Sequence, residues 1–398
     1  MKNNPFFIFL KYKAIFILSV FSCLQTYAQD QALVHAEKSL QAYKQSLDSL
    51  RRVHTNTREM PELHFFLFGM GDRTKLIYRG GKIIDANTGD ILKRWKVTKE
   101  IIVPSEYMVY LETEDGRKVR IIENEKGVYI LDGNRVTVSS ESKLNLPRFE
   151  NHPFAPVLRV LHHEILINIH NGLPVPNFMV YKKPWFRDAA LMAMVIKYTD
   201  NLHLIKDWIM HIRDPFDRNN HGMSEADNLG QVLFLVSLVS NKEHLAVQTV
   251  MDSVKEFEKE NYIEGKTGYA LHPVFQTKWM KYGLKSLGLD DPYQIPAVYD
   301  SYSSLFWQDF KDQHLAGKRF DEEISQNYPY LVWAEDHFFG ENKGIVTNQN
   351  YPLSWEAQAS DAYYPGLQVL NENLVKQKLS PPHTWHAAEM FLLLIEKR

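Results

Sequence analysis

Tryptophan and acidic side chains recur together in the C-terminal half of this 398-residue chain. Four times a proline stands shortly before a tryptophan, and an acid follows within about one helical turn, at Trp185, Trp333, Trp355 and Trp385. Because proline is tolerated in the first turn of a helix, each motif predicts a loop that enters a helix. Core packing of the indole and the helix dipole explain any single motif. The repetition favours a shared surface of flat apolar faces and hydrogen-bonding acids, which suits sugar rings.

The sharpest motif is the string Trp185-Phe186-Arg187-Asp188. Both charged residues fall in the expected first turn of a helix. An arginine donates hydrogen bonds and a carboxylate accepts them, so the pair can hold neighbouring hydroxyl groups while Trp185 offers a stacking face. The alternative is an ordinary ion pair at a helix start. We expect Trp185, Arg187 and Asp188 to bind a ligand.

A second motif places two acids, Glu335 and Asp336, between aromatic residues just before Gly340. A carboxyl held against apolar rings has a raised pKa, which is the condition for a general acid at neutral pH. Adjacent residues point to different sides of a helix, so at most one of the two faces a given cleft. We predict Asp336 as the acid and Glu335 as its substitute; a solvated acid pair is the alternative.

A third group lies at residues 223–231. Ser224 and Asp227 have the spacing of a capping box, with Asp in place of Glu, and are expected to cap a helix. This assignment leaves Glu225 free to face a ligand. Four further residues complete the predicted binding set: Trp333, Trp355, His383 and Trp385.

The N-terminus has the features of an export signal. Lysines precede a short apolar stretch, and Ala28 offers a cleavage point, so we expect residues 1–28 to be removed and the protein to be periplasmic or secreted. Lipid attachment at Cys23 is the alternative, and membrane association is expected only in that case. Because Cys23 is the single cysteine, the mature chain would have no thiol chemistry.

Composition and missing motifs exclude several function classes. A net charge of −2 gives no electrostatic footprint for nucleic acid. The sequence has no phosphate-binding glycine loop, nucleophile elbow or dinucleotide fingerprint. The histidines at 383 and 386, and the string His162-His163-Glu164, lack the further ligands of a zinc motif. No metal ion and no cofactor are therefore expected.

The pattern of apolar residues along the sequence changes twice. Residues 29–60 begin with an amphipathic helical pattern, residues 61–147 show short alternating runs broken by glycine turns, and residues 148–398 show helical periodicity. This order predicts a helical segment, a small antiparallel β-sandwich and a helical domain. Pairs of helices joined by loops of uneven length favour a C-terminal (α/α)6 toroid over a linear α-solenoid.

Three strings resemble the six-hairpin glycosidase superfamily. Trp185-Phe186-Arg187-Asp188 resembles the Trp-x-Arg-Asp motif of glucoamylase-type enzymes, in which Arg and Asp hold the terminal sugar. The ending at residues 383–389 resembles their last inner helix. Residues 333–340 are similar to the Trp-x-Asp-Asp pattern of unsaturated glucuronyl hydrolases, whose aspartate is the proton donor. The resemblance implies a toroid after a β-domain and exo-acting cleavage of a glycosidic bond.

On this basis we expect an exported glycoside hydrolase that acts on the end of an oligosaccharide, including one that carries a uronic acid. Asp336 or Glu335 would protonate the leaving oxygen, and Glu372 or Glu389 would activate water. One alternative is a polysaccharide lyase or sugar epimerase, with Tyr181, His221 and His337 as candidate bases. Another is a glycan-binding protein without catalysis.

Overall fold

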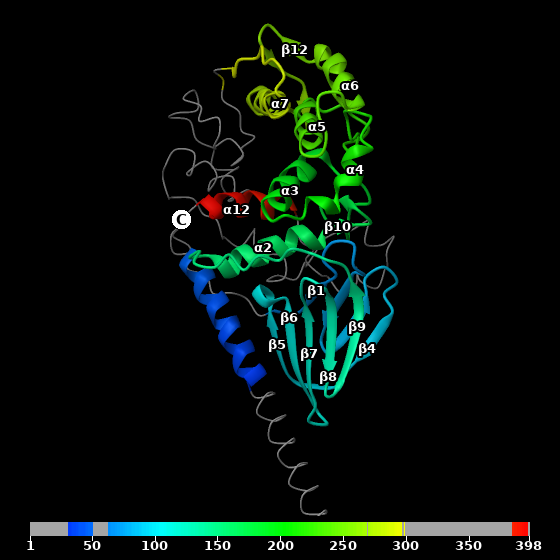
Figure 1. Cartoon of the computed structure of the whole chain (residues 1–398), viewed down its shortest axis with the longest axis vertical. Helices are drawn as coiled ribbons and strands as arrows, with labels where there is room; N and C mark the ends of the chain where they lie inside the picture. Colours follow the sequence, from blue (N-terminus) through cyan, green and yellow to red (C-terminus); the bar gives the residue numbers. More distant parts are fainter. Residues whose placement is uncertain (1–30, 51–62, 269, 297, 299–383, 397–398) are drawn as a thin grey trace, which may run out of the picture.

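Alternating apolar residues and tight glycine turns produce two antiparallel sheets before the first long helix of the chain's C-terminal part. The computed structural model describes residues 31–50, 63–268, 270–296, 298 and 384–396. In Figure 1 the sheets occupy one end of the molecule and the later helices the other. Strand-rich structure at residues 61–147, followed by helices, agrees with the order expected from the sequence.

Both sheets are meanders in which each strand pairs with the next strand along the chain. Turns at Gly80-Gly81, Gly116 and Gly133 adopt positive φ, as tight hairpins require. The four-stranded sheet contains β1 (Phe66–Phe68), β2 (Leu76–Arg79), β3 (Lys82–Asp85) and β4 (Ile91–Arg94). The five-stranded sheet contains β5 (Val97–Val103), β6 (Met108–Thr113), β7 (Lys118–Glu123), β8 (Gly127–Asp132) and β9 (Arg135–Glu141).

The helix at residues 31–50 confirms the amphipathic pattern read from the N-terminal segment. Its buried face packs Ala36 against the five-stranded sheet, in a cluster with Val103 and Tyr110. Outside this cluster, Lys99 Nζ lies 2.8 Å from Glu37 Oε1. The helix therefore covers a sheet face that would otherwise expose apolar residues.

Helices follow from residue 155 onward, with short hairpins between them. The long helices are α2 (Ala155–Ile167), α3 (Phe186–Tyr198), α5 (Asp227–Ser237), α6 (Leu245–Ser253), α7 (Pro273–Leu287) and α12 (Thr384–Glu396), and α4 (Lys206–Met210) is short. The hairpins pair β10 (Ile169–His170) with β11 (Leu173–Pro174), β12 (Glu258–Lys259) with β13 (Tyr262–Ile263), and β14 (Lys266–Thr267) with β15 (Ala270–Leu271). None of the helices in the described residues is long and apolar enough to cross a lipid bilayer.

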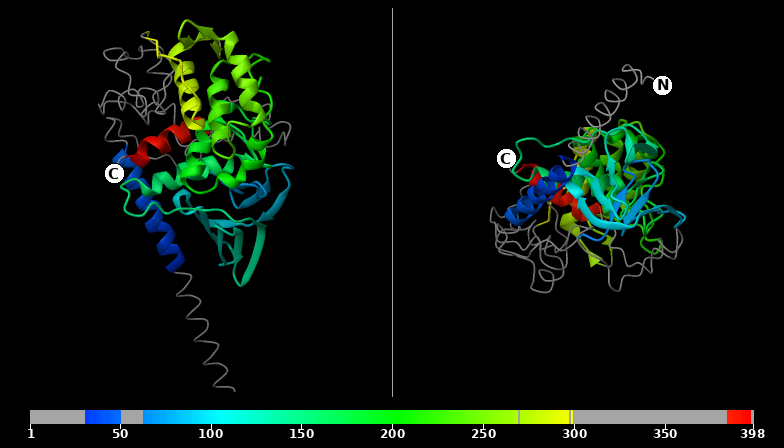
Figure 2. Two further views of the ribbon diagram at one scale, coloured as in Figure 1. Left: turned by 45° about the horizontal axis from the view of Figure 1, so that its top comes forward. Right: turned by 90° about the horizontal axis from the view of Figure 1, so that it is seen from below.

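The expected (α/α)6 toroid over residues 148–398 is wrong. Helices in the described part of this region are too few for six hairpins, and they pack in a row: α12 between α2 and α3, then α5, then α7. Figures 1 and 2 show this order, with α12 crossing beside α3. Helix α6 ends at Ser253, and a 3-10 turn and the β12–β13 hairpin follow it. Strands thus stand where the toroid requires the next part of a helical hairpin.

Two glycines allow α5 and α7 to approach very closely. A Cβ atom added at Gly230 would lie 2.1 Å from the carbonyl carbon of Trp279, and one added at Gly283 would lie 2.5 Å from the carbonyl oxygen of Gly230. Real Cβ atoms do not tolerate either distance. The fully buried ring of Trp279 fills the space beside this contact. These glycines therefore fix the spacing of two helices whose N-terminal ends carry polar residues.

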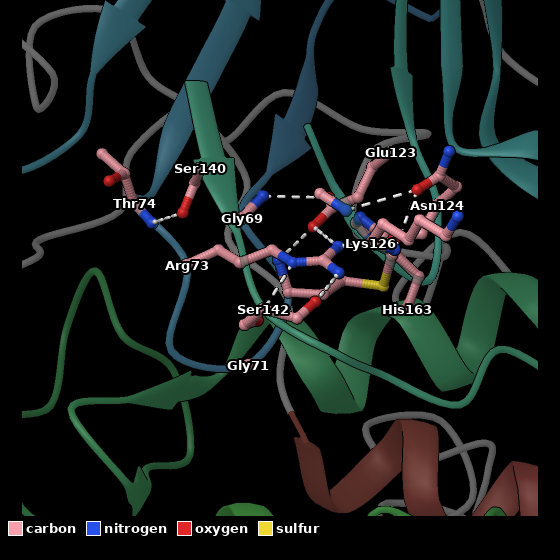
Figure 3. A network of polar contacts seen from close by, with 12 residues as sticks. Gly69, Gly71, Arg73, Thr74, Glu123, Asn124, Lys126, Ser140, Ser142 and His163 are labelled. Carbon is pink, nitrogen blue, oxygen red and sulfur yellow. Dashed lines mark hydrogen bonds and ion pairs between the residues drawn. The ribbon is translucent and has the colours of Figure 1, made fainter. Parts of the chain in front are cut away.

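A buried polar network ties both sheets to α2. Arg73 Nη1 lies 2.9 Å from Glu123 Oε1, and the amides of Gly69 and Met70 donate to the same carboxylate. Lys75 Nζ donates to the carbonyls of Gly69 and Gly71. Figure 3 shows how the β1–β2 loop wraps around Glu123, at the end of β7. Beside it, the amide of Gly71 donates to Leu166 O in α2 at 2.8 Å, so one loop joins three parts of the fold.

We expect Gly230→Ala to destabilise the protein by about 1–3 kcal/mol or more, because the new methyl group must separate α5 from α7. Urea unfolding followed by circular dichroism measures the change. Ser286→Ala, at an exposed position of α7, is the control and should change stability by less than ~0.5 kcal/mol. Equal effects of the two substitutions would contradict the close packing.

Lys75 gives the fold a specific dependence on pH. Complete burial lowers the pKa of Lys75 from its usual 10.5 to about 7, although nearby Glu123 opposes the shift. Between these values the unfolded chain binds the proton and the folded chain does not, so stability rises with pH by on the order of 1 kcal/mol per pH unit. We expect the stability of wild type relative to Lys75→Met to increase from pH 7.5 to 9.5 in urea titrations. A constant difference would show that Lys75 titrates normally.

Candidate functional site

The start of α3 is held by a neighbouring loop. Trp185 occupies the position before the helix, and the amide of Phe186 donates to Asp217 Oδ2 at 2.7 Å. Asn219 Nδ2 donates to the carbonyl of Pro184 at 2.6 Å. Side chains from another segment therefore satisfy backbone groups that a helix start leaves open. As predicted, the charged pair at residues 187 and 188 falls in the first turn of this helix, and both side chains are buried.

Arg187 joins residues that are far apart in the sequence. Its Nε lies 3.1 Å from Asp227 Oδ2, and its Nη2 lies 3.5 Å from Glu225 Oε1. The guanidinium carbon also lies 5.3 Å from the centre of the Trp385 ring, within range of a cation–π interaction. The starts of α3, α5 and α12 thus meet at one guanidinium.

Asp227 makes its contacts within this cluster and does not form the predicted capping box. Its Oδ1 accepts a hydrogen bond from Thr267 Oγ1 at 2.7 Å, and its Oδ2 accepts one from Gln231 Nε2 at 2.8 Å in addition to the contact with Arg187. Helix α5 begins at Asp227 itself, and the hydroxyl of Ser224 accepts a hydrogen bond from Arg218 at 3.2 Å. The capping prediction is wrong because the helix starts later than the spacing suggested.

Glu225 lies just before α5 and is 1% exposed. Its Oε1 accepts a hydrogen bond from the amide of Gly268 and a longer one, 3.4 Å, from Asn220 Nδ2. Burial raises the pKa of the Glu225 carboxyl, and the neighbouring charge of Asp227 raises it further, while Arg187 acts in the opposite direction. These contacts and that with Arg187 all fall on Oε1, and the role of Glu225 in facing a ligand stays a prediction.

Helix α12 is docked against the same place. Thr384 Oγ1 donates to Asp188 Oδ1 at 3.4 Å, and the amide of Thr384 donates to Pro176 O at 3.0 Å. Trp185 is half-buried beside these residues, and its ring meets that of Tyr181 edge-on, with 5.6 Å between centres. Burial raises the pKa of Tyr181, and the charge of Asp188 adds to this shift.

The structure therefore brings five predicted binding residues to one region: Trp185, Arg187, Asp188, Glu225 and Trp385. Of the predicted acids and bases, Glu389 lies on α12, one turn after Trp385, and is 2% exposed. The other predicted site residues lie outside the described residues: Trp333, Glu335, Asp336, Trp355, Glu372 and His383.

Sequence reasoning missed several members of the cluster. Asp217 had a usable signal, since an aspartate followed two residues later by asparagine is typical of a turn that exposes carboxylate oxygens. Thr267 and Gln276 had none; Gln276 Nε2 donates to Thr267 Oγ1 at 2.9 Å, and the two are joined only by the folding of a hairpin against α7. Burial raises the pKa of Asp217, with a smaller contribution from Asp227.

Charge and ligand type limit what this region can hold. Three carboxylates lie near Arg187, from Asp217, Glu225 and Asp227, and that of Asp188 contacts Thr384 at the start of α12. Within the described residues no group of three or more His, Cys, Asp or Glu side chains is placed to hold a metal ion. The histidines at 162 and 163 are buried in the core, and burial lowers the pKa of each to about 3.

Comparison with protein-family models, with curated proteins and with solved structures gives no significant match for this chain.

We expect Arg187→Met to destabilise the protein by about 3–5 kcal/mol, because it leaves Glu225 and Asp227 buried without their cation. The Glu225 carboxyl would then have an even higher pKa in the folded state than in the unfolded state, so the loss should be greater at pH 7.5 than at pH 5. Urea unfolding at both pH values measures this. Arg218→Met removes an exposed pair with Asp214 and should cost less than ~1 kcal/mol at either pH.

Proposed function

We propose that the protein is a glycoside hydrolase that releases a sugar from the end of an oligosaccharide. The observation that carries this proposal is the meeting of Arg187, Asp188, Glu225 and the indole of Trp385 at the starts of three helices. Such a group combines hydrogen-bond donors, hydrogen-bond acceptors and an aromatic face. Sugar rings require all three, since they present hydroxyl groups at their edges and apolar C–H groups on their faces.

The charge of the cluster favours a neutral terminal sugar. Arg187 already faces two carboxylates, so a uronate would compete with Glu225 and Asp227 for the same guanidinium. Asp188 and Asp217 add negative charge close by, which opposes an incoming anion. Hydroxyl groups carry no such penalty, and they can both donate to a carboxylate and accept from an arginine.

Resemblance of the string at residues 185–188 to the Trp-x-Arg-Asp motif of glucoamylase-type enzymes supports the same conclusion. The meeting of Arg187, Asp188, Glu225 and Trp385 does not require a closed ring of helices. A lyase or epimerase that uses Tyr181 as its base is less well supported, because burial raises the pKa of this hydroxyl.

We expect the purified full chain to release a monosaccharide from one or more oligosaccharides with neutral non-reducing ends, detected by mass spectrometry. Asp188→Asn should lower kcat/KM by about 10- to 100-fold, because a hydrogen bond to a charged group contributes about 1.5–3 kcal/mol. Asp214→Asn, in an exposed ion pair, is the matched control and should retain wild-type activity.

Two results would contradict the proposal. One is the absence of turnover by wild type on a broad panel of plant and animal oligosaccharides; binding without turnover would identify a glycan-binding protein. The other is full activity of Asp188→Asn, which would show that the cluster does not hold the substrate.

A further inference from the structure

We propose that Asp217 is a positioning residue of the sugar site, which holds the indole of Trp185 and the guanidinium of Arg187 in one fixed arrangement. This inference rests on the glycoside hydrolase function proposed above. It adds a residue that acts on the sugar through the binding residues. Its basis is a set of hydrogen bonds that begins and ends on the first turn of α3.

One loop holds the backbone on both sides of Trp185. Asp217 Oδ2 accepts a hydrogen bond from the amide of Phe186 at 2.7 Å, and Asn219 Nδ2 donates to the carbonyl of Pro184 at 2.6 Å. The other oxygen of Asp217 accepts from the amide of Asn219 at 2.9 Å, so the two side chains are also fixed relative to each other. The backbone that carries the half-buried ring of Trp185 is therefore held at both of its neighbours.

The backbone of this loop is itself constrained. Arg218, which lies between Asp217 and Asn219, has a φ of 53°, a conformation that residues with a Cβ atom rarely adopt. Such a conformation persists only where the surrounding contacts determine it. The hydrogen bonds of Asp217 and Asn219 to the start of α3 supply such contacts.

A second path of hydrogen bonds leads from Asp217 to Arg187 through α5. The amide of Asp217 donates to Asn228 Oδ1 at 3.2 Å, and Asn228 Nδ2 donates to Gln231 Oε1 at 3.2 Å. Gln231 Nε2 donates to Asp227 Oδ2 at 2.8 Å, and the same oxygen accepts from Arg187 Nε at 3.1 Å. Each of the two amide side chains accepts through its oxygen and donates through its nitrogen, so these contacts fix the direction in which both face.

The two paths form a closed circuit, because Phe186 and Arg187 are adjacent in the chain. They meet at Asp217, whose side chain holds the helix start and whose amide begins the path to the guanidinium. Asn228 and Gln231 are buried, where a hydrogen bond is stronger than in water. A displacement of Asp217 therefore changes the position of the indole relative to the guanidinium.

A sugar that binds here uses both ends of this circuit. Stacking against Trp185 and hydrogen bonding to Arg187 at the same time require a set distance and direction between the two groups. Contacts that hold binding groups in place before the ligand arrives increase affinity. Since Asp217 acts on groups that bind the sugar, its loss should weaken substrate binding more than the chemical step.

Two variants separate position from charge. Asp217→Asn keeps the size of the side chain but leaves one oxygen for two amides, so we expect KM on an oligosaccharide to rise about 10- to 100-fold, with kcat reduced less than about threefold. Asp217→Glu keeps the charge and displaces the carboxylate by one methylene, and it should also raise KM. Asp214→Asn, in the same loop but in an exposed ion pair, is the matched control and should leave both constants unchanged.

Amide hydrogen exchange in the protein without substrate tests the contact separately from the function. In Asp217→Asn the amide of Phe186 or Asn219 should exchange faster than in wild type, because one of them loses its acceptor. In Asp214→Asn both amides should exchange as in wild type.

Three results overturn this inference while the hydrolase function stands: unchanged KM in Asp217→Asn despite faster exchange, a fall in kcat without a change in KM, or a normal KM in Asp217→Glu. A wild type that neither cleaves nor binds any glycan overturns both proposals. If it binds without cleaving, the hydrolase function fails and the dissociation constants of the same variants decide the inference. If Asp217→Asn unfolds at a markedly lower temperature, the same measurements on Asn219→Ala, which removes the side-chain contact with Pro184, decide.

Discussion

Arg187 connects three helix starts because its guanidinium contacts Asp227, Glu225 and the ring of Trp385. Glu225 and Asp227 lie at the start of α5 and Trp385 lies in α12, so Arg187 joins two segments that are distant from it in the sequence. Asp227 accepts a hydrogen bond from Thr267 of the β14–β15 hairpin, and Thr384 at the start of α12 donates to Asp188. The geometry of the region therefore depends on a buried cation that compensates the carboxylates around it.

The sheets and the helices share one apolar core, which holds this region in place. A continuous apolar core extends from the N-terminal helix through both sheets to α12. The β1–β2 loop reinforces the junction through Arg73 and Glu123, whose side chains are completely buried, and through the contact of Gly71 with α2. Since α2 packs against both α3 and α12, the network in the sheets helps to hold the helices that carry Arg187 and Trp385.

Local sequence patterns predicted the features that depend only on neighbouring residues, such as turns and helix starts. Glycine turns with positive φ marked the strands, and Pro184-Trp185 marked the start of α3 within one residue. The partner of Arg187 was not predictable in this way, because Asp227 lies 40 positions further along the chain. The toroid failed for a related reason: after α6 ends at Ser253, contacts across the β12–β13 hairpin select strands within a region whose periodicity predicts helices.

A cluster of buried charges is costly to a fold, and its presence here needs a reason. Replacing buried ion pairs with apolar residues of similar size is often neutral or stabilising, so Arg187, Glu225 and Asp227 are not required for a core to form. The close contact of α5 and α7 through Gly230 and Gly283 already fixes the helix on which Asp227 lies. Places where a chain departs from the simplest stable solution are expected at functional sites. Within the described residues, the buried side chains of Arg187, Glu225 and Asp227 form such a departure.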